Sequence, residues 1–130
     1  MISHIDHIVF TVSDIERSSN FYQQVLNMPV ISFGEQQCAV RFGEQTLYLQ
    51  RLGDEVRHHA MEGAGNVGFV SDWPMKDILS HLQKHQVVVL EGPVEKQGPL
   101  GVMSCVYLND PDNNLIEIRV PVATTSGTND

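Results

Sequence analysis

Apolar and polar positions alternate at the start of the chain and then change to a helical spacing. From His4 to Val12 the alternation predicts a strand. Ser13-Asp14 then supplies helix-starting oxygens, and apolar positions recur at helical spacing up to Leu26, which predicts an amphipathic helix. Pro29 follows the stretch and stops it.

Three short apolar runs separated by glycines come next. They lie at Val30 to Phe33, Cys38 to Phe42 and Thr46 to Arg51, and they predict three antiparallel strands. Residues 53–65 are polar, with charges of both signs, and are typical of a linker. Its His58-His59 pair is interpreted as solvated side chains rather than a metal site.

The same order of elements then repeats. Asn66 to Val70 predicts a strand, and Ser71-Asp72 opens a second helix, with Pro74 near its first turn. The predicted strands that follow are Val87 to Leu90, Met103 to Leu108 and Leu115 to Val120. The interval from Ser13-Asp14 to Val30 equals the interval from Ser71-Asp72 to Val88, which supports an internal repeat.

The repeat predicts an α+β fold made of two paired βαβββ modules. The modules span residues 4–52 and 66–120 of one domain, 1–122, and residues 123–130 form a flexible tail. A module of this size cannot cover its own sheet face, so two modules must pair across a shared core. The pairing occurs within the chain or with a second chain, and the resulting mixed β-sheet is expected to curve around a cavity.

The last two predicted strands hold one anomaly, a carboxylate in an apolar run. They are joined by Asp110-Pro111-Asp112-Asn113, which is strong turn chemistry. Glu117 follows between Ile116 and Ile118, on the strand face that also carries Arg119. Two interpretations stay open: Glu117 faces water or pairs with Arg119, or it binds a cation.

The repeat also relates four polar positions to one another. His7 corresponds to Asn66, and Gln50 corresponds to Glu117. Histidine and carboxylate are good ligands for Zn²⁺, Fe²⁺, Mn²⁺, Ni²⁺ or Co²⁺, whereas amide oxygens are weaker ligands. We expect His7 and Glu117 to converge, although a single histidine in a strand is also a common structural residue.

Composition narrows the possible partners. The chain has 130 residues, a net charge of −8 and a pI near 5.0, which argue against nucleic acid as a partner. Its apolar runs are far shorter than the ~20 residues of a membrane span, and its start lacks the basic region of a signal peptide. Cys38 and Cys105 are isolated and predict free thiols in a reducing cytoplasm.

Four segments of the chain resemble the vicinal oxygen chelate superfamily, also called the glyoxalase/bleomycin resistance/dioxygenase fold. They are His4 to Phe10, Phe21 to Met28, Leu90 to Val94 and Asp110 to Glu117. The last is similar to the family pattern D-P-D-G-N-x-[IL]-E, with Asn113 in place of the usual glycine. Within the superfamily the chain is most similar to small glyoxalase-domain and virulence-associated proteins.

The resemblance implies paired modules that enclose a divalent metal such as Ni, Mn, Fe, Co or Zn. By the family pattern its ligands would be His7, Gln50, Asn66 and Glu117, with Glu117 also the catalytic group. The chain departs from the pattern at Asn66, where many metal-dependent members have His, and at Gln50, where glyoxalase I has Glu. One evident histidine is also too few for the facial triad of ring-cleaving dioxygenases.

Three functions remain open on this basis. The first is a metal-dependent lyase, isomerase or transferase that acts on a small oxygen-chelating substrate. The second is a metal-free binding protein of the bleomycin-resistance type, for which the acidic charge suits a cationic drug or metabolite. The third is a dimeric scaffold with a vestigial cavity. A cytoplasmic homodimer is expected in each case, and the candidate substrate-binding residues are Tyr48 and Arg119.

Overall fold

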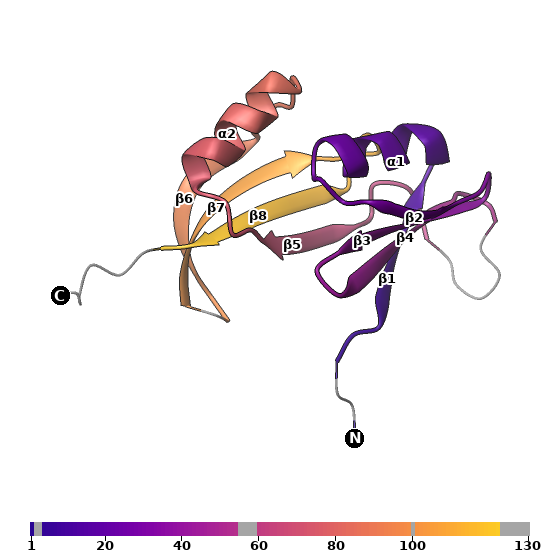
Figure 1. The fold of residues 1–130 in the computed structure, drawn as a ribbon, viewed down its shortest axis with the longest axis horizontal. Helices are drawn as coiled ribbons and strands as arrows, with labels where there is room; N and C mark the ends of the chain where they lie inside the picture. The colour runs from indigo at the N-terminus through magenta and orange to yellow at the C-terminus, as the bar shows by residue number, and fades with distance from the viewer. Residues whose placement is uncertain (2–3, 55–59, 100, 123–130) are drawn as a thin grey trace. The chain divides into compact units, whose positions relative to one another are not determined.

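The computed structural model describes residues 1, 4–54, 60–99 and 101–122, and over these residues the order βαβββ occurs twice (Figure 1). The α+β class and the repeated order are therefore confirmed. The first set is β1 (His7–Val12), α1 (Ile15–Gln24), β2 (Val30–Phe33), β3 (Gln37–Phe42) and β4 (Gln45–Arg51). The second set is β5 (Asn66–Val70), α2 (Met75–Lys84), β6 (Glu91–Gly98), β7 (Gly101–Asn109) and β8 (Leu115–Pro121).

The chain divides into two compact units. The first contains Met1–Asn66 and Asn109–Leu115, and the second contains Val67–Leu108 and the chain from Ile116 onward. The turn between β7 and β8 therefore belongs to the first unit, although both strands belong mainly to the second. The His58-His59 pair and the tail 123–130 lie outside the described residues, so both expectations remain predictions.

The sheet of the first unit has the strand order β1-β4-β3-β2. Strands β1 and β4 are parallel, with His7 opposite Thr46 and Thr11 opposite Gln50, and the other pairs are antiparallel. Helix α1 packs against β3 and β4. Because side chains alternate along a strand, the apolar face toward α1 and the polar face with His7 follow directly from the sequence pattern.

Helix α1 begins and ends at the residues that local chemistry favours. The Asp14 side chain accepts a hydrogen bond from the Arg17 amide at 2.9 Å, so Asp14 is the N-cap. Asn27 adopts a positive φ of 56°, a conformation that Asn tolerates, and turns the chain toward β2. The Tyr22 ring is fully buried between these two ends.

The second sheet has the order β5-β8-β7-β6, and Figure 1 shows α2 beside it. The prediction that Ser71-Asp72 opens α2 is wrong by a few residues. Pro74 is the N-cap residue, and the Ser71 hydroxyl instead accepts a hydrogen bond from the Trp73 amide at 3.1 Å. The proline suits this place because the first turn of a helix leaves its N–H groups unused.

The predicted strand from Val87 to Leu90 is also wrong. The strand begins at Glu91, and it runs through Gly92-Pro93 with a register shift between Glu91 and Val94. A bulge of this kind lets an edge strand contain a proline, which has no N–H to donate. Gly92 is required at this bulge, because a Cβ there would collide with the Cys105 carbonyl.

Candidate functional site

His7 lies at the start of β1, on the polar face of the first sheet. Its Nδ1 atom is 2.9 Å from the Asp6 carboxylate, and 45% of its side chain is exposed. Its ring meets the Tyr48 ring edge-on, with 5.0 Å between the centroids. Tyr48 is therefore the neighbour that the fold gives to His7, and its role in substrate binding stays a prediction.

Gln50 lies on the same face but further along the sheet. Gln50 stands opposite Thr11, whereas His7 stands opposite Thr46. Thr46 and Gln50 are four residues apart, which corresponds to about 13 Å along a strand. Its amide is engaged locally: Nε2 donates to the Gln36 carbonyl at 3.2 Å, and Oε1 accepts from Gln37 at 3.2 Å. The structure does not bring Gln50 and His7 together.

Thr11, which stands opposite Gln50 and is 4% exposed, has a buried hydroxyl that lacks a hydrogen-bond partner among the described residues. Such a group usually bonds an ordered water or a ligand. The Thr11 hydroxyl is therefore available to hydrogen-bond a water molecule or a polar ligand at this end of the sheet face.

Asn66 is the first residue of β5 and is exposed. In the first unit, it follows Gly65, whose amide donates to the Asn114 side chain at 2.7 Å. A Cβ at Gly65 would lie only 2.7 Å from that same Asn114 oxygen, so the backbone needs glycine at this approach. Asn66 is thus placed by the turn that precedes β8.

Glu117 lies in the middle of β8, in the second unit, and is 8% exposed. Its Oε2 atom accepts a hydrogen bond from Arg119 Nε at 2.8 Å. Burial raises the pKa of Glu117, but bonding to Arg119 and polar contacts from Tyr107 and Cys105 outweigh it and hold the pKa below its usual range. Of the two interpretations left open by the sequence, the pair with Arg119 is present in the structure.

Two glycines leave room for the Arg119 side chain. A Cβ at Gly98 would collide with Arg119 Nη1, whereas one at Gly68 would lie 3.5 Å from Arg119 Nε and 3.7 Å from Glu117 Oε1. Gly98 is at the end of β6 and Gly68 is in β5, so the guanidinium extends over the face of the sheet. The backbone around Arg119 is shaped to hold the ion pair.

Three further side chains join this face, and the sequence did not single them out. Cys105 and Tyr107 alternate along β7 and contact Glu117, and Lys96 Nζ lies 4.7 Å from the centre of the Tyr107 ring. Burial raises the pKa of the Cys105 thiol, so the group stays protonated at neutral pH. The alternation along β7 could have shown that Cys105 and Tyr107 share one face of the sheet. Only the pairing of β7 with β8 shows that this face carries Glu117. We call Glu117, Arg119, Tyr107, Cys105 and Lys96 the Glu117 cluster.

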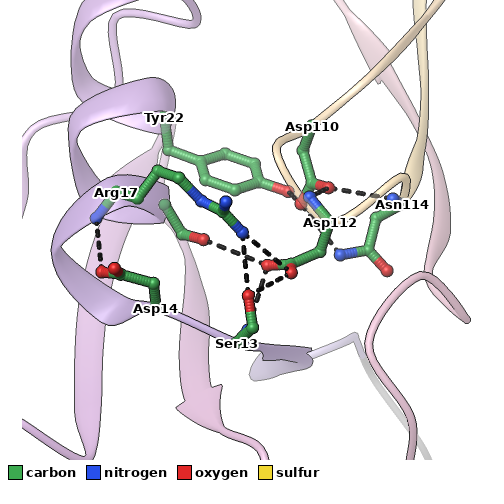
Figure 2. Close-up of polar contacts among 8 residues, drawn as sticks. Ser13, Asp14, Arg17, Tyr22, Asp110, Asp112 and Asn114 are labelled. Carbon is green, nitrogen blue, oxygen red and sulfur yellow. Dashed lines mark hydrogen bonds and ion pairs between the residues drawn. The ribbon is translucent and has the colours of Figure 1, made fainter.

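A second polar network surrounds the turn after β7, within the first unit (Figure 2). The Tyr22 hydroxyl donates to Asp110 Oδ2 at 2.7 Å, and Asn114 Nδ2 donates to the same atom at 2.8 Å. Asp112 accepts from the Ser13 amide at 3.1 Å and from Arg17 Nη2 at 3.1 Å. Asp110 and Asp112 of the Asp-Pro-Asp turn therefore bind the turn to α1 and to the residue before its N-cap.

Within the described residues, neither unit alone supplies the three or more protein ligands of a catalytic metal centre. No three His, Cys, Asp or Glu side chains gather anywhere in these parts of the chain in a way that would hold an ion. The Glu117 Oε2 atom accepts from Arg119, and Oε1 keeps lone pairs that a cation could use. His7 belongs to the first unit and Glu117 to the second, so their convergence stays a prediction.

Comparison with known proteins identifies the family. A family model described as Glyoxalase/Bleomycin resistance protein/Dioxygenase superfamily matches residues 4–118. The chain belongs to this superfamily. The resemblance carried by the Asp110 to Glu117 segment is therefore confirmed.

Two relatives of this glyoxalase-family chain show the similarity in detail. Virulence protein STM3117 of Salmonella typhimurium is 36% identical over 121 residues, which cover 91% of this chain and 84% of the relative. Its crystal structure matches with a TM-score of 0.86 at 35% identity, over 94% of this chain and 99% of that chain, which confirms the glyoxalase-like fold. Glyoxalase domain-containing protein RDO1 of Mycosarcoma maydis is 37% identical over 120 residues, or 90% of this chain and 68% of the relative.

A more distant relative is named as a transferase. Metallothiol transferase FosB of Staphylococcus epidermidis is 26% identical over 120 residues, which cover 92% of this chain and 84% of the relative. The helices in the described ranges of the glyoxalase-family chain are all too short or too polar to cross a membrane.

Proposed function

We propose that this glyoxalase-family protein binds a small, oxygen-rich molecule through the Glu117 cluster, and that binding needs no metal ion. The observation that carries the proposal is the ion pair of Glu117 and Arg119 in the middle of a sheet. Burying an ion pair rarely adds stability compared with apolar packing, so its presence in a strand favours a functional role.

The chemistry of the cluster suits ligand oxygens. Arg119 and Lys96 provide N–H donors, and Tyr107 supplies an aromatic face beneath the ammonium group. Carboxylate, phosphate and phosphonate groups are the partners that a guanidinium and an ammonium group bind best. Glu117 offsets the charge of Arg119, and Lys96 leaves the cluster with one net positive charge. We therefore expect geometry to contribute to recognition beside a modest attraction of anions.

The lowered pKa of Glu117 favours binding over proton transfer. A general base works best when its pKa lies near the working pH, and Glu117 is shifted in the opposite direction. Glu117 is therefore proposed as a residue that orients Arg119. Its role as a catalytic base remains a hypothesis for a state in which Arg119 has moved away.

A second candidate function is a metal-dependent transferase or lyase. The similarity to metallothiol transferase FosB and the presence of His7 and Tyr48 on one sheet face favour it. In this candidate, His7 and Glu117 would be the main donors to a divalent Ni, Mn, Fe, Co or Zn ion, with Asn66 and Gln50 as weaker donors. The ion would polarise a substrate oxygen. A homodimer belongs to both candidates and is likewise a proposal.

One experiment separates the two candidates. Untagged protein, purified without chelator, is analysed for metal content and then screened by thermal shift against small carboxylates and phosphonates, with and without EDTA. A bound compound at about ten times its Kd should stabilise the protein by about 1.4 kcal/mol and raise Tm by several degrees. We expect this shift to persist in EDTA.

The variants make the assignment specific. Lys96→Gln should abolish the shift, whereas Lys76→Gln, at an exposed position on α2, should retain it. Metal near one ion per chain that is lost in Glu117→Gln, together with a shift that disappears in EDTA, would refute metal-free binding and support the second candidate. A shift that is equal in Lys96→Gln and the parent would refute the Glu117 cluster as the site.

A further inference from the structure

Two histidines lie one turn apart at the end of helix α2. His81 is in the last turn and His85 is the C-cap residue, so the pair has the i, i+4 spacing that brings side chains to the same helix face. Their ring centroids are 4.5 Å apart with an interplanar angle of 53°, and both side chains are half-buried. The two rings are therefore already adjacent without any rearrangement of the backbone.

We propose that His81 and His85 form a binding site for a divalent transition metal, separate from the Glu117 cluster. Imidazole nitrogens bind Zn²⁺ at about 2.0–2.1 Å and also suit Cu²⁺ and Ni²⁺. Rings at the observed separation place one nitrogen each on a common ion after small side-chain rotations. A helix holds both ligands on one rigid frame, so the second bond forms at high effective concentration.

The electrostatic setting favours a cation at this place. The C-terminal end of a helix carries the negative end of its dipole, and the chain as a whole has a net charge of −8. Lys84 opposes the ion from the same turn, but it is exposed and its charge is screened by solvent. No third His, Cys, Asp or Glu joins the pair within the described residues, so water molecules would fill the remaining positions around a bound ion.

The site has its own reporter. The Trp73 ring meets the His81 ring edge-on, with 5.4 Å between centroids, and Trp73 is the only tryptophan of the chain. Cu²⁺ and Ni²⁺ have open d shells and quench indole fluorescence at short range, whereas Zn²⁺ has a filled shell and does not. An ion on His81 would therefore reduce the Trp73 emission.

The test is a fluorescence titration of the full, untagged chain in a buffer without chelator. We expect saturable quenching by Cu²⁺, weaker affinity for Ni²⁺ in accordance with the order of metal affinities, and reversal of Cu²⁺ quenching by excess Zn²⁺. Mg²⁺ should have no effect, because it prefers oxygen ligands. His81→Gln and His85→Gln should each weaken the apparent Cu²⁺ affinity by about 100-fold.

Matched histidine variants serve as controls. His4→Gln and the double variant His58→Gln/His59→Gln should quench like the parent, since they leave α2 unchanged. Gln is a good helix former, and far-UV circular dichroism verifies that α2 survives its introduction. Nitrogen hyperfine structure in the Cu²⁺ electron paramagnetic resonance spectrum should fall from two imidazoles to one in His85→Gln. Quenching that is unchanged in both helix variants, or lost in a control, would overturn the proposal.

Discussion

Replacing Tyr22 by Phe should destabilise the protein through a single hydrogen bond. The Tyr22 hydroxyl donates to Asp110 Oδ2 at 2.7 Å, and Tyr22 and Asp110 are 0% and 4% exposed (Figure 2). Phe keeps the ring and its packing, so the change removes the hydroxyl alone. The perturbation therefore isolates the contact that joins helix α1 to the turn before β8.

The size of the effect follows from what Asp110 retains. Its carboxylate still accepts from the Asp112 amide at 2.9 Å, the Asn114 amide at 2.9 Å and the Asn114 side chain at 2.8 Å. One lost bond to a buried charged group costs about 1.5–3 kcal/mol. For a chain of this length the loss corresponds to a decrease in Tm of roughly 5–10 °C.

Urea denaturation followed by circular dichroism measures the free energy of unfolding. Tyr48→Phe is the matched control: the Tyr48 hydroxyl has no hydrogen bond to other described residues, and its loss should change stability by less than about 0.5 kcal/mol. If Tyr22→Phe costs no more than this control, the buried network contributes nothing to stability, and the reasoning is wrong.

Alkaline pH provides a second arm of the same prediction. Burial and the neighbouring Asp110 carboxylate raise the pKa of Tyr22 well above its ordinary value of 10.0. The unfolded chain releases this proton near pH 10 while the folded chain keeps it, so stability is present below pH 10 and falls as pH rises. The fall should be shallower in Tyr22→Phe by about 1.4 kcal/mol per pH unit. Equal slopes in the two proteins would contradict the assignment.

Three other changes test separate parts of the structure. Asp112→Asn should cost about 1–3 kcal/mol in urea denaturation, because it removes the charge bonded at the start of α1; an unchanged midpoint would refute this role. Gly92→Ala should lower Tm because its Cβ would collide with the Cys105 backbone carbonyl, whereas Gly68→Ala, which meets only ordinary contacts, should be tolerated; the reverse order would be inconsistent with the bulge at Gly92. The pKa of Glu117 is lower in the folded protein than in the unfolded chain, where it is about 4.3, so Glu117 stabilises the fold above that pH. This stabilisation is lost as the pH falls, so the free energy of unfolding should decrease more steeply with falling pH in the parent than in Glu117→Gln; equal slopes would contradict the assignment.

Local chemistry explains which parts of the fold were predictable. Helix α1 was predictable from Asp14 because a capping oxygen acts on an amide three residues away. The strand at Val87 to Leu90 was not, since its residues look like a strand but the sheet pairs the next segment, from Glu91. Strand pairing is a long-range property, so the apolar run alone could not place the boundary.

In the candidate site too, the sequence predicts which residues share a face, and the pairing of strands decides which of them are neighbours. Alternation places Tyr48 and Gln50 on one face, and a period of two cannot decide which of them stands beside His7. The pairing of β1 with β4 decides it in favour of Tyr48. In the same way, the Asp-Pro-Asp turn was recognisable as a turn, but only the folded chain shows Asp110 bonded to Tyr22.

The sequence by itself determined the order of the elements, the βαβββ repeat, the superfamily and the anomaly of Glu117 among apolar neighbours. These properties depend on residues close to one another along the chain, where spacing and capping chemistry act directly. Only the tertiary structure decided the partner of Glu117, the membership of the Glu117 cluster and the contact of Trp73 with His81. The reason is that strand register and helix packing bring together side chains from separate segments, and no local pattern encodes that distance.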